Sequence, residues 1–339
     1  MPEALRRIAQ ALIDHSEHDG LIVLYPHVGA DGDALGSALA LSLALDELDV
    51  ASLVLLDEAP PAKLSFMPDL DRVRVFSQED QRSLALRQSL ALAIDCTESS
   101  RVGRRQELFE SAPNKASIDH HKSAGQSDGL RWVETTASAT GELIFQLIRL
   151  MEEMTETTIL DRPIAICLMG AILSDTGGFV FSNTTANTFR IAAELMNERL
   201  DIRQMTYLLF DETSQTKLRL TGEVFSNARF LSDGRVAIGT VSLDQMRRLG
   251  AVDEDLDGLV GQLRSAHGVD VAFMLREMPD GSIRVNIRSD ERFDAADFAS
   301  HFGGGGHPRA AGMTLSGISL QEASDWVAGK AGEELSSVT

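Results

Sequence analysis

The sequence of 339 residues is short of cysteine, of aromatic residues and of long apolar runs. Only two cysteines are present, Cys96 and Cys167, which excludes a disulfide framework and a cysteine-rich metal site. Each stands in an apolar run and is predicted to be a buried free thiol. No apolar run reaches the roughly 18 residues of a membrane span, and the charged stretch 1–20 predicts an amphipathic helix rather than a signal peptide. We therefore expect a cytoplasmic protein with no membrane partner.

Positive charge is also scarce, because 31 Lys and Arg residues face 51 Asp and Glu residues and leave a formal net charge of -20. A protein that binds long nucleic acid needs a track of basic residues to neutralise phosphates and aromatic residues on which bases stack. This chain has 5% aromatic residues and no long basic track. The composition argues against long nucleic acid and leaves small anionic substrates, held in one local basic pocket.

The chain does have the apolar content of a globular protein, with 43% hydrophobic and 24% charged residues, and its length predicts two domains. Its first half alternates strand-like and helix-like runs, which is typical of an α/β domain with a parallel sheet. The predicted strands are 21–25, 51–56, 90–95 and 116–119, and the predicted helices after residue 20 are 35–48, 141–154 and 161–173.

From about residue 215 the pattern changes to that of a smaller α/β domain. Residues 269–289 predict two strands joined by a turn at 279–281, and alternation in the second strand places Arg284, Asn286 and Arg288 on one face. The remaining predicted elements are a strand at 235–243, helices at 255–266 and 294–302, and a strand at 310–315. We expect domains at 1–195 and 217–330, joined by a helical linker at 196–216.

The loop HVGADGDALGS, residues 27–37, directly follows a predicted strand and leads into a predicted helix. It places His27, Asp31 and Asp33 at the carboxyl end of a strand, where α/β sheets carry their sites. The alternative is an ordinary turn in which Asp33 caps the next helix.

Three further groups of aspartate and histidine also end predicted elements. Asp95 ends one strand, the triplet Asp119-His120-His121 ends another, and Asp175 follows the apolar helix 161–173. In the triplet, one histidine could bind a metal while Asp119 fixes its tautomer through the other ring nitrogen. Each aspartate taken alone could be a helix cap or a turn residue.

Taken together, these residues predict a metal centre. Four aspartates at one sheet edge (residues 31, 33, 95 and 175) would repel one another strongly, and two divalent cations would neutralise them. Carboxylates and imidazoles without thiolates suit Mn²⁺ or Mg²⁺ better than structural zinc.

A last motif, HFGGGGHPRAAG at 301–312, predicts an anion pocket. Its four glycines allow backbone N–H groups to approach a phosphate closely, and His307 and Arg309 add cationic donors. Arg288 could add a bidentate phosphate contact. Arg264, alone on a predicted helix, is better explained as a solvated surface charge. The alternative for the glycine run is a flexible loop.

In this order the motifs resemble the DHH/DHHA1 phosphoesterase superfamily, and the short two-domain form is similar to its nanoRNase/pAp-phosphatase group. The resemblance spans residues 20–315, and Ala30 departs from it where many members have proline, without removing a ligand. It rests on HxxxDxDAxGS at 27–37, DCTESSRVG at 95–103, DHH at 119–121, SDTG at 174–177, RS at 288–289 and GGGGH at 303–307.

The resemblance implies an amino-terminal DHH domain, a DHHA1 domain and two metal ions, Mn²⁺ with Mg²⁺ as the alternative, which activate a water for attack on phosphorus. One ion would be held by His27, Asp31 and Asp95, and the other by Asp33, Asp95, His120 and Asp175. His121 would face the substrate phosphate and Asp119 would orient the histidines. The rest of the substrate would be held by Arg288, Ser289, Gly304, Gly305, His307 and Arg309.

The resemblance also implies hydrolysis of short oligoribonucleotides, linear dinucleotides and 3′-phosphoadenosine 5′-phosphate (pAp), by a protein that forms a homodimer in many relatives. Cyclic dinucleotides as substrates, a manganese pyrophosphatase, a RecJ-like single-strand exonuclease and a catalytically silent nucleotide sensor are the alternatives. The sequence leaves open which end of an oligonucleotide is attacked and which of the short substrates is preferred.

Overall fold

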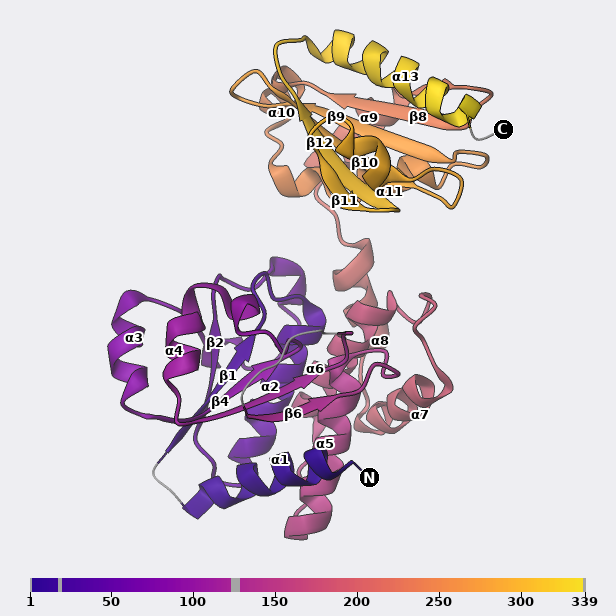
Figure 1. The fold of residues 1–339 in the computed structure, drawn as a ribbon. Coiled ribbons are helices and arrows are strands. Elements are labelled where there is room, and N and C mark those ends of the chain that lie inside the picture. The colour runs from indigo at the N-terminus through magenta and orange to yellow at the C-terminus, as the bar shows by residue number, and fades with distance from the viewer. Residues whose placement is uncertain (1, 18–19, 123–128, 338–339) are drawn as a thin grey trace. The chain divides into compact units, whose positions relative to one another are not determined.

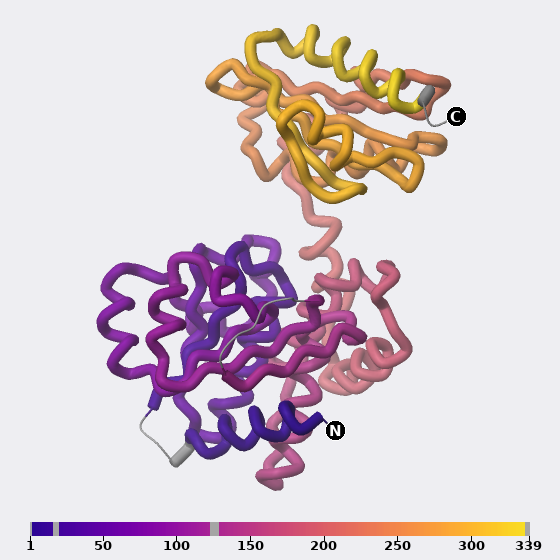
Figure 2. The backbone as a smooth tube through the Cα atoms, in the orientation of Figure 1, coloured from indigo at the N-terminus to yellow at the C-terminus, as the bar shows by residue number. Residues whose placement is uncertain are grey.

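The computed structural model describes residues 2–17, 20–122 and 129–337 (Figures 1 and 2). The chain forms two compact units, Met1–Glu212 and Thr213–Thr339. Residues of the predicted linker lie partly in the first unit, where they form the short helices η5 (Met196–Glu198), α8 (Ile202–Thr206) and η6 (Tyr207–Asp211). The division of function between 1–195, 196–216 and 217–330 stays a prediction.

The first unit is built on a six-stranded parallel sheet with the strand order β3-β2-β1-β4-β5-β6. The chain leaves β1 toward β2 and β3, and later returns to place β4 on the other side of β1. Ligands of such sheets bind beyond the carboxyl ends of the strands at this reversal of order. The strands are β1 (Leu21–Pro26), β2 (Ser52–Leu56), β3 (Val73–Val75), β4 (Gln88–Ile94), β5 (Asn114–Asp119) and β6 (Leu130–Val133).

Helices cover both faces of this sheet (Figure 1), as a parallel sheet requires. The larger apolar core lies under α1 (Glu3–Ile13), α2 (Gly32–Asp46), α5 (Thr140–Thr155) and α6 (Arg162–Thr176), with α7 (Ala186–Leu195) outside them. The smaller core lies under α3 (Gln78–Ala85) and α4 (Gln106–Ser111). Short helices η1 (Asp14–Glu17), η2 (Ala62–Leu64), η3 (Leu70–Arg72) and η4 (Ser99–Arg105) occupy connections.

The predicted strands and helices of this unit are confirmed, with shifted ends. Helix α2 begins at Gly32, three residues before the predicted start. Its residues are apolar on all sides, which fits its buried position between the sheet and α6. Helix α6 runs on to Thr176. Residues 1, 18 and 19 of the predicted amino-terminal helix lie outside the described residues.

The second unit has a mixed six-stranded sheet of order β11-β12-β10-β9-β8-β7, antiparallel except between β8 and β9. Its strands are β7 (Arg229–Leu231), β8 (Val236–Val241), β9 (Val271–Glu277), β10 (Ile283–Ser289), β11 (Gly305–His307) and β12 (Ala310–Leu315). One face packs on α12 (Ala295–Ser300) and α13 (Leu320–Ser337), and part of the other on α9 (Gln215–Ser226), α10 (Leu243–Leu249) and α11 (Leu259–Arg264), which follows η7 (Asp253–Leu256).

One prediction for this unit needs correction. The helix predicted at 255–266 is broken, because Gly258 takes a φ of 84° between η7 and α11. The end of the glycine run pairs as β11 with β12, which argues against the alternative of a wholly flexible loop. The predicted strand alternation at 283–288 is confirmed, with Ile283, Val285 and Ile287 buried. Among the described residues, no helix combines the length and the apolar character needed to cross a membrane.

Candidate metal centre and substrate groove

The loop after β1 places His27 and Asp31 beside each other. Asp31, not Asp33, caps α2, because its Oδ1 accepts hydrogen bonds from the backbone N–H groups of Asp33 (3.0 Å) and Ala34 (3.1 Å). The imidazole of His27 uses Nδ1 on the carbonyl oxygen of Val28 (2.8 Å). Its Nε2 therefore points into the site, 3.9 Å from Asp31 Oδ1 and 3.4 Å from Asp95 Oδ2.

A buried arginine fixes the strand end that carries this loop. The guanidinium of Arg105 is fully buried and donates to the carbonyl oxygens of Pro26 at the end of β1 (2.8 Å), of Val102 (2.9 Å) and of Leu55 in β2. Burial lowers the pKa of Arg105 to about 10, so it remains charged at neutral pH. This role of Arg105 is not predictable from the sequence, because Arg105 lies outside every motif described above.

Asp33 lies in the first turn of α2 and is completely buried. It faces the amino terminus of α5, whose backbone N–H groups at Thr140 and Gly141 donate to its two oxygens at 2.6 and 2.9 Å. Burial, and then the carboxylates of Asp95 and Asp175, raise the pKa of Asp33 well above its usual value, against these hydrogen bonds. A cation is needed to keep this carboxyl ionised at low cost.

Asp95 occupies the middle of the site. It directly follows β4 in the left-handed region, with a φ of 62° that aspartate tolerates better than most residues. It caps no helix: Oδ1 accepts from Thr140 Oγ1 at 2.7 Å and lies 3.6 Å from His120 Nε2, while Oδ2 faces His27. Asp95 thus contacts both histidines that would serve different ions.

The histidines of the DHH triplet are held in different ways. Asp119 Oδ1 accepts from both the backbone N–H and the ring Nδ1 of His121, each at 2.9 Å, and this bond raises the pKa of His121 to about 9. His120 instead uses Nδ1 on the carbonyl oxygen of Ala137 at 3.2 Å. Asp119 therefore orients His121 alone, which corrects the expectation that it orients both.

Asp175 lies in the last turn of α6 rather than after the helix as predicted. Its Oδ2 is 3.2 Å from His120 Nε2. Burial, together with the carboxylates of Asp95 and Asp31 and against the opposing effect of His120, raises the pKa of Asp175 to about 6. The raised pKa reflects how closely the carboxylates of the site are crowded together.

The six predicted metal ligands fall into joined groups whose ligand atoms lie within 4.8 Å of one another: His27, Asp31 and Asp95; Asp33, His120 and Asp175; and Asp95 with the two histidines of the triplet. The buried His120 Nε2 has no hydrogen-bond partner in the described structure, although oxygens of Asp33, Asp95 and Asp175 lie within 3.7 Å. An orphaned imidazole nitrogen among carboxylate oxygens fits a divalent cation. Both cysteines are buried thiols, as predicted, and neither belongs to these groups.

A small cavity of about 220 Å³ opens beside this centre. Its lining includes Asp95, Asp119 and His121, and also the cationic residues Arg101 and Lys122. Sequence reasoning did not single out either cation. Their positions, within DCTESSRVG and directly after the DHH triplet, were the available signal.

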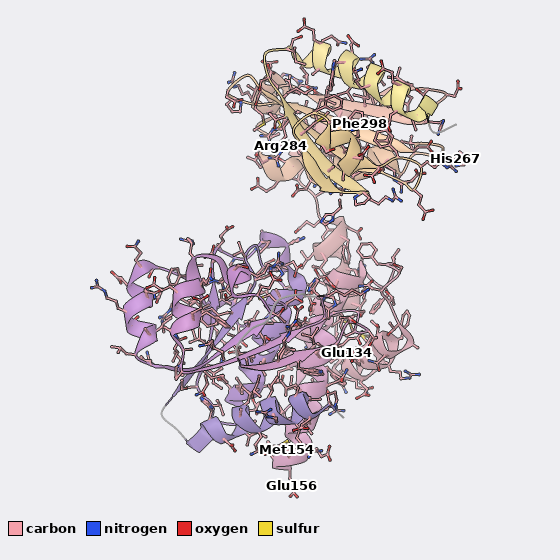
Figure 3. All side chains as sticks on the ribbon, in the orientation of Figure 1. Glu134, Met154, Glu156, His267, Arg284 and Phe298 are labelled. Atoms are coloured by element: carbon pink, nitrogen blue, oxygen red, sulfur yellow. The ribbon has the colours of Figure 1, made fainter. Side chains whose placement is uncertain are left out.

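A larger depression of about 710 Å³ lies on the open face of the second sheet. It is lined by Arg288, Gly304 and Gly305, as predicted, and also by Arg284 and Asn286. The predicted alternation places Arg284 and Asn286 on this face, but the sequence analysis predicts a substrate contact for neither. Figure 3 labels Arg284 and also Phe298, which packs in the core on the opposite face.

The other predicted residues of the anion pocket do not line this groove. Ser289 is buried, and its hydroxyl donates to the carbonyl oxygen of Pro308 at 3.1 Å. Arg309 is exposed and reaches the carbonyl oxygen of Phe293 at 3.3 Å, and His307 is exposed at the end of β11. Arg264 ends α11 outside the groove, consistent with a surface charge.

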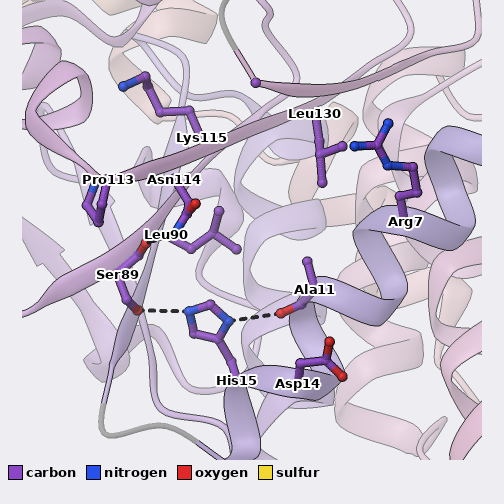
Figure 4. Close-up of a pocket in the computed structure, with 11 residues that line it drawn as sticks. Arg7, Ala11, Asp14, His15, Ser89, Leu90, Pro113, Asn114, Lys115 and Leu130 are labelled. Atoms are coloured by element: carbon purple, nitrogen blue, oxygen red, sulfur yellow. Dashed lines mark hydrogen bonds between the residues drawn. The ribbon is translucent and has the colours of Figure 1, made fainter.

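Another cavity, of about 690 Å³, lies at the amino-terminal end of the first sheet (Figure 4). Its lining includes Leu90, Asn114 and Leu130 near the starts of three strands, and His15, which contacts Ser89 Oγ at 2.8 Å. The metal ligands stand at the opposite, carboxyl-terminal end, so this cavity is separate from them.

The sequence and the structure are similar to those of known proteins. The sequence matches the DHH family, N-terminal domain, over residues 21–172 and the DHHA1 domain over residues 233–332. It is 33% identical to the bifunctional oligoribonuclease and PAP phosphatase NrnA of Thermus thermophilus, over 98% of this chain and 95% of that protein. It is 29% identical to the protein of the same name from Bacillus subtilis, over 87% of this chain and 89% of that one.

A crystal structure of an exopolyphosphatase-related protein from Bacteroides fragilis has the same overall architecture. It superposes with a TM-score of 0.81 and 27% sequence identity, and the match covers 97% of this chain and 98% of that one.

Proposed function

The chain belongs to the DHH family of phosphoesterases, and on that premise we propose that it hydrolyses short oligoribonucleotides and linear dinucleotides to 5′-mononucleotides, and pAp to AMP. The observation that carries this proposal is the joined set of six metal-ligand residues around the orphaned His120 Nε2, next to a cavity that contains Arg101 and Lys122. The names of the two relatives support the same substrate class.

We assign the ligands as the sequence predicts: His27, Asp31 and Asp95 for one divalent ion, and Asp33, Asp95, His120 and Asp175 for the other. Such ions polarise phosphoryl oxygens and lower the pKa of water when bound. Manganese is proposed over magnesium because magnesium prefers oxygen ligands alone, whereas each group here includes an imidazole.

The protein's own groups would bind and orient the phosphate. Arg101 and Lys122 supply positive charge in an otherwise acidic site, and His121 lines the same cavity as a further donor. Asp119 is a positioning residue, because its carboxylate holds the ring of His121 through Nδ1. These contacts would compensate the charge of a substrate phosphate that the four aspartates alone would repel.

The groove of the second unit would hold the rest of the substrate. Arg288, Gly304 and Gly305 line it, and Arg284 and Asn286 extend the same surface. Gly304 leaves no room for a side chain, because a Cβ there would stand 2.3 Å from the carbonyl oxygen of Gly312. Ser289, His307 and Arg309 do not line this groove, so their contacts with substrate stay predictions from the resemblance; Ser289 would act through its bond to Pro308.

Short substrates are favoured over long ones because two divalent ions would still leave the chain near -16, from -20 plus 4. A homodimer and a cytoplasmic location stay predictions from the sequence.

The test gives EDTA-treated protein, with and without added Mn²⁺, a 5′-phosphorylated dinucleotide, pAp, a cyclic dinucleotide and a long single-stranded RNA. We expect Mn²⁺-dependent release of mononucleotides from the dinucleotide and little action on the long RNA. Equal degradation of the long RNA would contradict the short-substrate proposal. A preference for the cyclic dinucleotide would redirect it to that class, and no turnover of any substrate would refute it.

A further inference from the structure

Two large apolar side chains that closely follow the metal-ligand candidate Asp175 are exposed, Val180 at 81% and Phe181 at 58%. Phe210, in η6, is 47% exposed. Exposed apolar patches are typical of surfaces that bind a ligand or a partner, because binding removes their apolar area from water.

The segment is also free of charge. Residues 176–189 contain no Asp, Glu, Lys or Arg, although 24% of the chain is charged and its net charge is -20. An anion that approaches the metal centre along this segment meets no like charge from it. The segment is therefore suited to a ligand with one anionic part and one flat apolar part.

The exposed rings pack close to the backbone of two glycines. A Cβ on Gly177 would stand 2.5 Å from the ring of Phe181, and a Cβ on Gly178 would stand 3.4 Å from the ring of Phe210. Phe181 therefore packs against the backbone two residues after Asp175, a separation of at most about 7 Å along the chain. The ring therefore packs against the segment that carries Asp175.

The backbone between Asp175 and Phe181 is tightly wound and strained. Gly177, Gly178 and Phe179 take positive φ angles of 56°, 69° and 70°, the last unusual for a residue with a side chain. The buried Thr176 organises the turn: its carbonyl oxygen accepts from the N–H groups of Val180 and Phe181, both at 2.9 Å. The side chains of Val180 and Phe181 are thus presented by a fixed turn and not by a loose loop.

We propose that Phe181, flanked by Val180 and Phe210, is a stacking platform for a nucleobase of the substrate whose phosphate lies at the metal centre. The inference rests on the proposed function, since it assumes a nucleotide substrate. Bases stack on exposed aromatic rings without regard to sequence, which suits an enzyme of mixed short oligonucleotides. A base is joined to its phosphate through one sugar, so a ring next to a metal ligand is within its reach.

The first experiment compares Phe181→Leu, which keeps the apolar bulk but removes the ring, with Phe181→Trp, which keeps a ring. Each is given a 5′-phosphorylated dinucleotide and an abasic analogue with the same phosphates, with Mn²⁺. Stacking contributes about 1–3 kcal/mol per base, so we expect Phe181→Leu to raise KM for the dinucleotide by about 5- to 150-fold, and Phe181→Trp to restore it. KM for the abasic analogue should not change. Phe230→Leu is the matched control, because Phe230 is 51% exposed but lies in β7 of the other unit.

A second readout separates this inference from the proposed function. A phosphorothioate dinucleotide that carries 2-aminopurine loses fluorescence when its base stacks, without needing turnover. Quenching by the wild type but not by Phe181→Leu supports the platform even where no substrate is hydrolysed, an outcome that would refute only the proposed function. Absence of quenching by the wild type overturns the platform.

Equal loss on the dinucleotide and the abasic analogue also overturns it. If that loss comes with a change from dimer to monomer in light scattering, the patch is a contact between two copies of the chain instead.

Discussion

The two candidate sites of this protein are built on opposite principles. The metal centre is partly buried, acidic and fixed by backbone hydrogen bonds near the ends of parallel strands. The groove of the second unit is an open depression lined by the polar residues of β10 together with the glycine run and β12. All six predicted metal ligands meet in the first site, but only three of six predicted residues line the second. The residues that miss the groove have other surroundings: His307 and Arg309 are exposed, and the buried Ser289 bonds to the backbone of Pro308.

The largest effect should come from removing one ligand of the buried site. We expect His120→Ala to lower the rate of dinucleotide hydrolysis more than about 100-fold. Loss of a residue that only hydrogen-bonds to a metal ligand typically lowers activity about 10–100-fold, and loss of a ligand itself should lower it further. Manganese titration should show one ion lost and one retained, because His27 and Asp31 remain. His267→Ala is the control, since His267 is exposed in the second unit. Full activity of His120→Ala would show that the buried cluster is only structural.

A smaller effect is expected from the residue that positions His121. Asp119→Asn replaces the acceptor of the bond to His121 Nδ1, so activity should fall about 10–100-fold while both ions still bind. The pKa of His121, followed by NMR in the metal-free protein, should fall from about 9, because the hydrogen bond to Asp119 is the main cause that raises it. An unchanged His121 pKa would contradict this role.

The groove should respond in affinity and not in turnover. Charge-assisted hydrogen bonds are worth about 1.5–3 kcal/mol, so Arg288→Ala should raise KM for the dinucleotide about tenfold or more and leave kcat nearly unchanged. Arg284→Ala should act in the same direction, since Arg284 lines the same depression. Arg264→Ala is the matched control. A fall in kcat with KM unchanged would contradict the prediction that Arg288 binds substrate in the groove.

The smallest effect concerns the stability of the metal-free protein. The pKa of Asp175 is raised in the folded state from 3.8 to about 6, so the folded protein binds the proton more tightly than the unfolded chain. The free energy of unfolding should therefore fall as pH rises through this window, and Tm should drop by a few degrees. Asp175→Asn should flatten the dependence, and saturating Mn²⁺ should reverse the loss. A Tm that rises over the same window would contradict the raised pKa.

The comparison also shows what a sequence can predict. The positions of Asp95 and His120 follow from strand ends, because parallel strands bring their carboxyl ends to one edge. The alternative that Asp33 caps α2 was wrong, because the helix begins earlier than predicted and Asp31, an equally good capping residue, is its cap. The strand β3 is not predicted from the sequence, because three largely exposed residues are too few to show the hydrophobic pattern of a strand.

In the second unit, the prediction of a basic face was right and the prediction of its ligands was incomplete. Alternation in β10 fixes that Arg284, Asn286 and Arg288 share a face. Which glycines and cations stand next to them depends on the register of β11 and β12, and a single sequence does not carry that register.

The most direct test of a shared two-ion centre uses Asp95, the residue that contacts histidines of both groups. Metal-free wild type and Asp95→Asn are titrated with Mn²⁺ while mononucleotide release from a dinucleotide is followed. We predict two ions and rapid release for the wild type, and weakened binding of both ions with loss of release for Asp95→Asn. Unimpaired hydrolysis by Asp95→Asn, or hydrolysis by the wild type after complete removal of metal, would contradict the account.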